Sequence, residues 1–297
     1  MDTMEHCMLC PRACGADRLH GKTGYCGMTA ALRVARVALH QWEEPCISGT
    51  NGSGTVFFSG CPLRCVYCQN HEIALGHGGK PMTIPELADS FLSLQAQGAH
   101  NIKLVTPTHY IPQIVQALRI AKADGLSLPI VYNTGSYETV EALRMLEGLI
   151  DIYLPDCKYF NAAFAQTYSH APDYFAVATA AIAEMVRQVG APQFDEASGL
   201  MQRGVLVRHL LLPTHTADSK AIVRYLYETY GDGIYLSLMN QYTPLPHVAD
   251  IPVLTQPVTE AAYDEVVDYA IELGVENGFI QEGGTVSESF IPPFTLE

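Results

Sequence analysis

The chain has 297 residues, of which 48% are hydrophobic and 16% charged, a composition that excludes a disordered protein and indicates a large packed core. Lys and Arg total 17 against 31 Asp and Glu, a formal net charge of −14, which argues against a protein that binds nucleic acid phosphates. No apolar run approaches the roughly 18 residues of a membrane span, and the opening MDTMEHCMLC lacks the charged-then-apolar order of a secretory signal, so we expect a cytoplasmic, reducing setting.

Nine cysteines are present, and eight of them fall within the first 68 residues. A disulfide framework would spread and pair its cysteines, so this crowding in a cytosolic chain indicates metal binding instead. We expect two parts: a Cys-rich, loop-rich extension over residues 1–50 and one domain over residues 51–297.

The extension carries a four-cysteine motif, Cys7-x2-Cys10-x3-Cys14-x11-Cys26. One Cys-x2-Cys pair among Gly-rich turns is typical of closed metal sites. Zinc and an auxiliary iron–sulfur cluster both fit, with a structural role or a role in electron relay. Reduced free thiols in a loop are the alternative. Cys46 stands alone and could replace one of the four or have no role.

From residue 54 onward, short apolar runs alternate with helical patterns. The runs are rich in Val, Ile and Leu, as parallel strands buried on both faces are, and they cover residues 54–60, 101–107, 129–134, 149–158, 205–213 and 234–240. We expect helices over residues 83–98, from Ser136 to residue 148, and over residues 173–190 and 258–274, with a surface loop over residues 191–204. Thr83 and Glu86 predict a capping box for the first helix, and Gly98 its end. This alternation indicates a parallel α/β architecture.

Three further cysteines, Cys61-x3-Cys65-x2-Cys68, follow the first of these strands, at the carboxyl edge where parallel α/β folds gather function. An iron–sulfur cube ordinarily takes four cysteines, so three would leave one iron open to a substrate or cofactor. The alternative is a zinc knuckle whose fourth ligand lies elsewhere, for example His71. The spacing, the preceding strand and Tyr67 before the last cysteine favour the cluster.

With this motif, "CPLRCVYC", the chain resembles the radical S-adenosylmethionine (SAM) superfamily. The segments "EEPCISG", "NIKLVTPTHY", "IYLPDCKYF", "VRHLLLP" and "SLMNQYTP" resemble proteins similar to pyruvate formate-lyase activating enzyme, over most of the chain. The resemblance implies an α/β fold, a partial parallel (β/α)6 barrel with the Cys-rich N-terminal extension. It implies a [4Fe–4S] cluster on Cys61, Cys65 and Cys68, with SAM on the fourth iron. One electron would cleave SAM to a 5′-deoxyadenosyl radical that abstracts a hydrogen atom, so no side chain is assigned a catalytic role.

The resemblance also implies contacts to SAM at successive strand ends. Tyr67 would lie beside the adenine. Thr106 and Thr108 stand where many relatives carry Gly-Gly-Glu, and their hydroxyls can accept a hydrogen bond from the SAM ammonium; a helix N-cap is the alternative for Thr108. Asn133 and Thr134 stand in a turn that resembles the Asp-Thr-Asn-Gly of the activating enzymes.

Asp156 and Lys158 resemble the Asp-x-Lys of the activating enzymes, where the Asp meets the ribose or a cation and the Lys meets the SAM carboxylate. Residues i and i+2 share one face of a strand, so both should point the same way, and a local ion pair is the alternative. Cys157 should then point to the opposite face, as a packing thiol. Arg208 and Gln241, on the fifth strand and after the sixth, could reach SAM or substrate.

The leading hypothesis is therefore a radical SAM enzyme that receives its electron from a donor such as flavodoxin or ferredoxin. Activation of a glycyl radical enzyme is the analogy that the resemblance offers, and modification of a peptide or small molecule is its rival. The alternative from another class is a non-catalytic iron–sulfur or zinc protein. We expect no nucleic acid or membrane partner.

Overall fold

The structure, a computed structural model, describes residues 4–281. The strands are β1 (Leu32–His40), β2 (Ser53–Phe58), β3 (Lys80–Met82), β4 (Ile102–Val105), β5 (Ile130–Thr134), β6 (Ile152–Pro155), β7 (Gln193–Phe194), β8 (Met201–Leu210), β9 (Tyr235–Met239) and β10 (Gly278–Ile280). The α-helices are α1 (Pro45–Ser48), α2 (His71–Ala74), α3 (Ile84–Ala96), α4 (Ile111–Ala123), α5 (Val140–Arg144), α6 (Ala162–Ser169), α7 (Tyr174–Val189), α8 (Thr216–Tyr230) and α9 (Glu260–Leu273).

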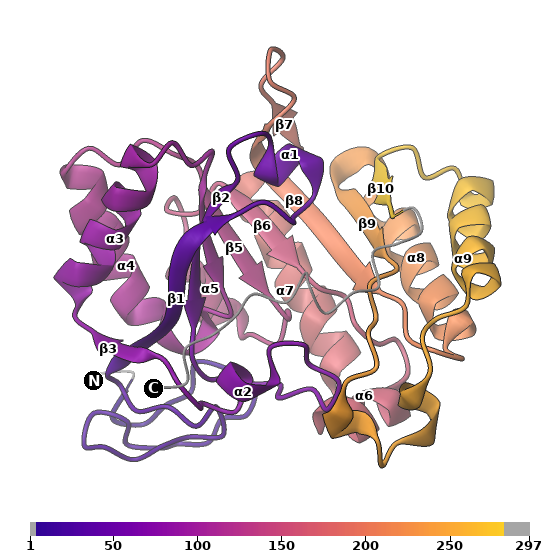
Figure 1. Cartoon of the computed structure of the whole chain (residues 1–297), viewed down its shortest axis with the longest axis horizontal. Coiled ribbons are helices and arrows are strands. Elements are labelled where there is room, and N and C mark those ends of the chain that lie inside the picture. Colours follow the sequence, from indigo (N-terminus) through magenta and orange to yellow (C-terminus); the bar gives the residue numbers. More distant parts are fainter. Residues whose placement is uncertain (1–3, 282–297) are drawn as a thin grey trace.

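The strands of residues 4–281 form one sheet in the order β10-β9-β8-β6-β5-β4-β2-β1-β3, with β7 paired to β8. From β2 to β10 the strands on this path are parallel, whereas β1 pairs antiparallel with β2 and β3. The six predicted apolar runs correspond to β2, β4, β5, β6, β8 and β9, so the α/β fold with a mostly parallel sheet is confirmed. The sheet curves but ends at β3 and β10, and within the described residues it does not close into a barrel (Figure 1).

Alternate residues of the central strands face two different cores, because side chains of a strand point to opposite faces in turn. The larger core lies between the outer face and the helices: Ile102 and Leu104 of β4 belong to it with helix residues such as Phe91. A smaller core fills the inside of the curve, with Val131 and Leu206 among its members. Figure 1 shows α3 and α4 beside one end of the sheet and α8 and α9 beside the other.

The predicted start of helix α3 is confirmed. The hydroxyl of Thr83 accepts from the Glu86 backbone N–H, and Glu86 Oε2 accepts from the Thr83 backbone N–H at 2.7 Å, which is the reciprocal pair of a capping box. The helices predicted over residues 173–190 and 258–274 correspond to α7 and α9.

Two predicted boundaries are wrong. The helix expected from Ser136 begins at Val140, with Thr139 as its N-cap. Ser136 instead has a φ of +61°, because residues 136–138 turn inward, where Glu138 is buried. The segment 191–204 is not all loop, since β7 and the first residues of β8 form an antiparallel pair there.

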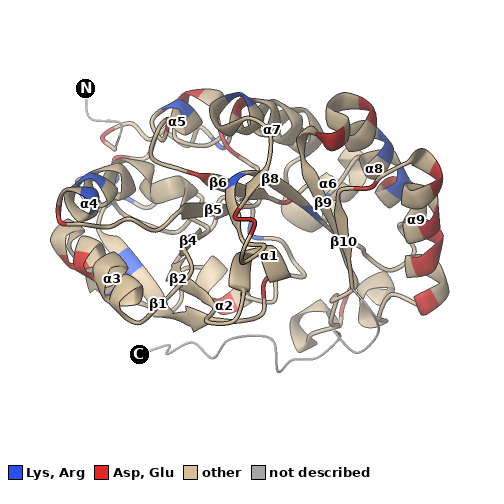
Figure 2. Cartoon of the chain, turned by 90° about the horizontal axis from the view of Figure 1, so that it is seen from above, with Lys and Arg blue, Asp and Glu red and all other residues tan. Residues whose placement is uncertain are grey.

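The first 50 residues do more than extend the domain. β1 alternates apolar and polar residues over LRVARVALH and joins the sheet beside β2. Helix α1 lies inside the curve of the strands (Figure 2), where Cys46 and Ile47 pack against Val131 and Leu206. The loop-rich part therefore ends near Ala31, and α1 fills the interior of the open sheet.

Much of the acidic charge lies on outer helices such as α9 (Figure 2). Within the described residues, no helix combines the length and the apolar character that crossing a membrane requires.

Candidate active site

A cavity of about 340 Å³ opens at the carboxyl ends of the parallel strands. It is lined by Cys61, Cys65 and Cys68 together with every residue that the sequence suggested as a contact to SAM: Tyr67, Thr106, Thr108, Asn133, Thr134, Asp156, Lys158, Arg208 and Gln241. These residues come from six different strands or the loops that follow them. Their convergence follows from topology, because the carboxyl ends of parallel strands meet at one edge of the sheet.

The three cysteines of the loop after β2 line the cavity, and two of their sulfurs accept hydrogen bonds. Cys61 Sγ accepts from the backbone N–H of Leu63 at 3.4 Å, and Cys65 Sγ accepts from the hydroxyl of Ser169 at 3.0 Å. Arg64 turns the loop with a φ of +51°. Such N–H and O–H donors suit sulfurs that carry negative charge.

Burial opposes ionisation of the Cys61 and Cys68 thiols in the free chain. It raises the pKa of Cys61 to about 11 and that of Cys68 to about 12, and the neighbouring sulfurs add to the rise. A metal centre would offset that cost, because cationic metal stabilises thiolate. Among residues 4–281 no three His, Cys, Asp or Glu side chains are already placed to hold a metal ion. What fits a cluster is the chemistry of three thiols that line one cavity.

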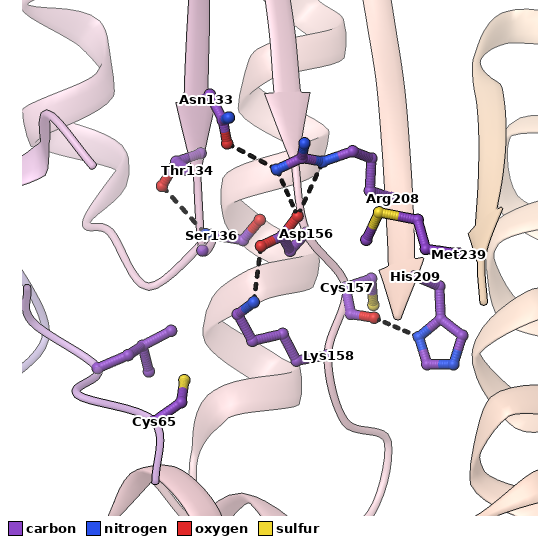
Figure 3. A network of polar contacts seen from close by, with 12 residues as sticks. Cys65, Asn133, Thr134, Ser136, Asp156, Cys157, Lys158, Arg208, His209 and Met239 are labelled. Atoms are coloured by element: carbon purple, nitrogen blue, oxygen red, sulfur yellow. Dashed lines mark hydrogen bonds and ion pairs between the residues drawn. The ribbon is translucent and has the colours of Figure 1, made fainter. Parts of the chain in front are cut away.

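A network of charges crosses the cavity (Figure 3). Lys158 Nζ lies 2.6 Å from Asp156 Oδ2, and Arg208 Nη2 lies 3.0 Å from Asp156 Oδ1. Arg208 also donates to the side-chain oxygen of Asn133 at 2.7 Å. Asp156 and Lys158 share a face as predicted, and in this state they form the local ion pair that was the alternative interpretation.

The other half of this network was not predicted. Glu43, in the segment between β1 and α1, accepts from Lys103 through Oε1 and from Arg208 Nη1 at 3.1 Å through Oε2. The side chain of Lys103 is 0% exposed and that of Glu43 10%. A fully buried ammonium needs such a partner, so the lone lysine in the apolar run NIKLV was a signal in the sequence that a buried carboxylate lay nearby.

The pKa values follow from this pairing. Burial disfavours the charged forms of Glu43 and Asp156, but the cations beside them, Lys103, Lys158 and Arg208, outweigh it and hold both carboxyl pKa values below their ordinary range. Burial lowers the pKa of Lys103 in spite of Glu43. All five groups are therefore interdependent, because removal of one leaves a buried charge without its partner.

Glu138 is a second residue that the sequence analysis missed, since it was assigned to a helix. Its Oε1 accepts from the hydroxyls of Thr108 at 2.7 Å, Tyr132 at 2.7 Å and Thr134 at 3.0 Å. Both threonines line the cavity. Because both hydroxyls donate their hydrogen bonds to Glu138, the lone pairs of their oxygens remain free to accept hydrogen bonds from a ligand. Thr106 beside them has a φ of +56°, a conformation costly for a β-branched residue and found mostly at functional sites.

Tyr67 and Gln241 line the cavity, and each makes a hydrogen bond within the protein. The hydroxyl of Tyr67 accepts from that of Tyr159 at 2.8 Å, and the Gln241 amide donates to Met239 Sδ at 3.0 Å. Cys157 is 0% exposed and packs in the larger core, as predicted. His71 stacks on His247, with ring centroids 4.2 Å apart, and is not among the residues that line the cavity.

A sequence model of the radical SAM superfamily matches residues 55–225, more than half of the chain. An uncharacterised protein of Methanocaldococcus jannaschii is 25% identical over 278 residues, which cover 91% of this chain and 74% of that protein. A solved radical SAM methyltransferase from Sphaerobacter thermophilus has a TM-score of 0.53 at 15% identity, over 78% of this chain and 67% of its own, a similarity of fold alone. A pyruvate-formate lyase-activating enzyme domain from Bacteroides vulgatus reaches a TM-score of 0.40 at 11% identity, over 58% of this chain and 92% of its own, which is too low to support a closer relation.

The buried pairing of Glu43 and Lys103 yields a stability prediction. Glu43→Gln leaves the Lys103 ammonium without a counter-charge, so we expect the free energy of unfolding at pH 7 to fall by about 3–5 kcal/mol. Because the folded pKa of Glu43 is depressed, its contribution is complete above the ordinary carboxyl range and is lost as the pH falls below about 4. The difference between variant and natural chain should therefore shrink in acid. Urea unfolding at pH 7 and pH 3.5 measures it.

Glu196→Gln, on an exposed loop position, is the matched control and should change stability by less than about 0.5 kcal/mol. A Glu43→Gln chain as stable as the natural one at pH 7 would show that the ion pair does not stabilise the fold.

Proposed function

The chain belongs to the radical SAM superfamily, and on that premise we propose that it is an enzyme that cleaves SAM reductively at a [4Fe–4S] cluster in order to abstract a hydrogen atom from a substrate. The family implies both cofactors. The observation that carries the proposal is the convergence of the three cysteines and nine polar or aromatic residues on a single cavity. When bound, cluster and SAM supply a 5′-deoxyadenosyl radical, and the protein supplies orientation and exclusion of water.

In this proposal Cys61, Cys65 and Cys68 hold the cluster. Lys158 holds the SAM carboxylate while keeping its bond to Asp156, since an ammonium has three donors. Thr108 and Thr134 donate hydrogen bonds to Glu138, and their hydroxyl oxygens accept hydrogen bonds from the SAM ammonium. The family resemblance implies most of these assignments, and the chemistry of each group and its place in the cavity support them.

Other cavity residues suit the ring systems and the reacting end of SAM. Tyr67 lies beside the adenine, with its hydroxyl fixed by Tyr159. Asp156 and Arg208 face the ribose, and Gln241 lies toward the substrate. Glu43 acts through Arg208, so we regard it as a positioning residue.

The finer part of the proposal is activation of a glycyl radical enzyme, with an electron from a flavodoxin or ferredoxin. Its support is the resemblance of segments such as "IYLPDCKYF" to activating enzymes. Deuterium transfer between a candidate partner labelled at its glycine α-carbon and 5′-deoxyadenosine tests it. Transfer from a small molecule or peptide, and none from any glycyl radical enzyme tried, would replace this substrate class.

Anaerobic reconstitution tests the enzyme itself. With iron, sulfide, dithionite and SAM, we expect the natural chain to bind about four irons at the central triad and to release 5′-deoxyadenosine. The variant with Cys61, Cys65 and Cys68 replaced by Ala should release none. Cys157→Ala is the control, because this thiol is buried in the core away from the cavity, and it should retain both iron and product. Release that persists without the triad would contradict the proposal.

Lys158→Met tests the assignment of the carboxylate. The loss of one charge-assisted hydrogen bond, about 1.5–3 kcal/mol, should weaken SAM binding by roughly 10- to 100-fold. Asp156 keeps Arg208 as its partner, so iron content should not change. Equilibrium binding of SAM to the reconstituted protein measures the effect, and Lys158→Arg should retain most of the affinity. Unchanged affinity in Lys158→Met would remove Lys158 from the SAM site.

A further inference from the structure

Helix α6 ends against the loop that carries the three central cysteines, residues 61–68, which we call the central cysteine loop. Inside this loop the backbone N–H of Val66 donates to the carbonyl of Tyr168 at 2.8 Å. Ser169, the last residue of α6, is 0% exposed, and its hydroxyl donates to Cys65 Sγ at 3.0 Å. The two residues are 104 positions apart in the chain, so the fold as a whole brings this hydroxyl to the sulfur.

The donor to Cys65 differs in kind from the donor to Cys61. Cys61 Sγ accepts from the backbone N–H of Leu63 at 3.4 Å, and a tight loop offers backbone donors of this kind whatever its side chains are. The donor to Cys65 is a side-chain hydroxyl on a separate helix. It can be removed by one substitution that leaves the backbone of the loop unchanged, so its effect on the sulfur can be measured by itself.

The hydroxyl of Ser169 is in turn held by Tyr159. Tyr159 is 1% exposed, and its Oη lies 2.8 Å from Ser169 Oγ and 2.8 Å from Tyr67 Oη. Each hydroxyl has one proton to donate. When the Cys65 sulfur is negatively charged it accepts from Ser169, and the Ser169 oxygen then accepts from Tyr159. Tyr159 accepts in turn from Tyr67, so the hydrogen bond between the two tyrosines changes direction once the sulfur is charged.

Arg12 fixes the end of α6 against the central cysteine loop. The last carbonyls of a helix have no partner inside the helix, and α6 ends at His170 with a φ of +50°. Arg12 Nη2 donates to the carbonyl of Ser169 at 2.7 Å, and Nη1 donates to that of His170. Its Nε donates to the carbonyl of Pro62, within the loop, at 2.8 Å. One guanidinium therefore holds Ser169 and the loop at a fixed separation.

Arg12 belongs to the segment 4–31, which contains neither helix nor strand. Arg18, 1% exposed, anchors this segment, because its Nη1 donates to the carbonyl of His109 at 2.6 Å. The guanidinium of Arg12 stacks on Tyr25, 4.0 Å from the ring centroid. No three of the four cysteines in the segment are placed to hold a metal ion, so the site predicted there stays a prediction. The contact that the segment makes with the central cysteine loop is that of Arg12.

We propose, on the basis of the proposed function, that Ser169, supported by Tyr159, raises the reduction potential of the cluster through the sulfur of Cys65. Reduction adds one negative charge, part of which lies on the sulfurs, and hydrogen bonds to the sulfurs are among the features that set the potential of a cluster. A buried and oriented donor stabilises the reduced state more than the oxidised one, because water does not compete with it. Neither residue lines the cavity, so both are positioning residues that act through Cys65.

A redox titration tests the role of Ser169. The natural chain and its variants are reconstituted anaerobically with iron and sulfide and followed by electron paramagnetic resonance without SAM. Ser169→Ala removes one hydrogen bond to charged sulfur, so we expect the reduction equilibrium to move about tenfold toward the oxidised cluster, a potential about 59 mV more negative for one electron. The carbonyl of residue 169 remains for Arg12, so iron content should not change.

Thr167→Ala is the matched control. It removes a hydroxyl from an exposed position of the same helix, where that hydroxyl donates to the carbonyl of Ala163, and the potential should stay that of the natural chain. A Ser169→Ala chain that binds its cluster at an unshifted potential would overturn the proposal and leave the proposed function intact. A natural chain that takes up no cluster at its triad would contradict the proposed function, and the role of Ser169 with it.

Tyr159→Phe tests the chain of hydroxyls. It should lower the potential by less than Ser169→Ala does, because Ser169 keeps its own proton and loses only its support. The double variant should match Ser169→Ala alone, since Tyr159 acts through Ser169, and additive shifts would overturn that dependence. If Ser169→Ala binds too little iron to be titrated, an unshifted potential in Tyr159→Phe would overturn the proposal by itself.

Discussion

The interior of this sheet is organised around buried charge. Lys103, Arg208 and Lys158 bring three cations to the inside of the curve, and Glu43 and Asp156 are the carboxylates that compensate them. None of these groups could be buried alone, since the cost of an unpaired ion exceeds what surrounding packing returns. These ion pairs connect residues on β4 and β8, after β6 and before α1. They therefore hold the elements that surround the cavity in one relative position.

The same constraint explains why the chain uses its first 50 residues as it does. An open parallel sheet leaves its interior exposed unless something fills it, and here α1 does so with Cys46 and Ile47. Glu43, just before this helix, is the counter-charge of Lys103 and Arg208. The N-terminal region is thus part of the candidate site at two places, through Glu43 on the interior side and through Arg12 at the central cysteine loop.

The sequence predicted the parallel strands well, because continuous apolar runs are local signals, and it placed the cysteine loop correctly at the carboxyl edge of the sheet. The sequence predicted element boundaries and site residues poorly where contacts between residues far apart in the chain override local preference. SYETVEALRMLEG has helical periodicity from its first residue, yet Glu138 is drawn out of the helix by three hydroxyls from β5 and the segment after β4. β1 could have been found, since LRVARVALH alternates as a half-buried strand does. Glu43 could not be paired with Arg208 from spacing, because no periodicity relates residues so far apart.

That separation, 165 residues between Glu43 and Arg208, has a consequence for how the chain acquires its native state. A nascent polypeptide contains the helix that fills the interior long before β8, which carries Arg208, has been synthesised, and contacts of such range form late and slowly. Before β8 is synthesised, Glu43 and Lys103 lack Arg208 as the third member of their charge network, and the concave face of the incomplete sheet remains in contact with water. The network of buried charges can therefore be completed only once β8 has been synthesised, in the last third of the chain.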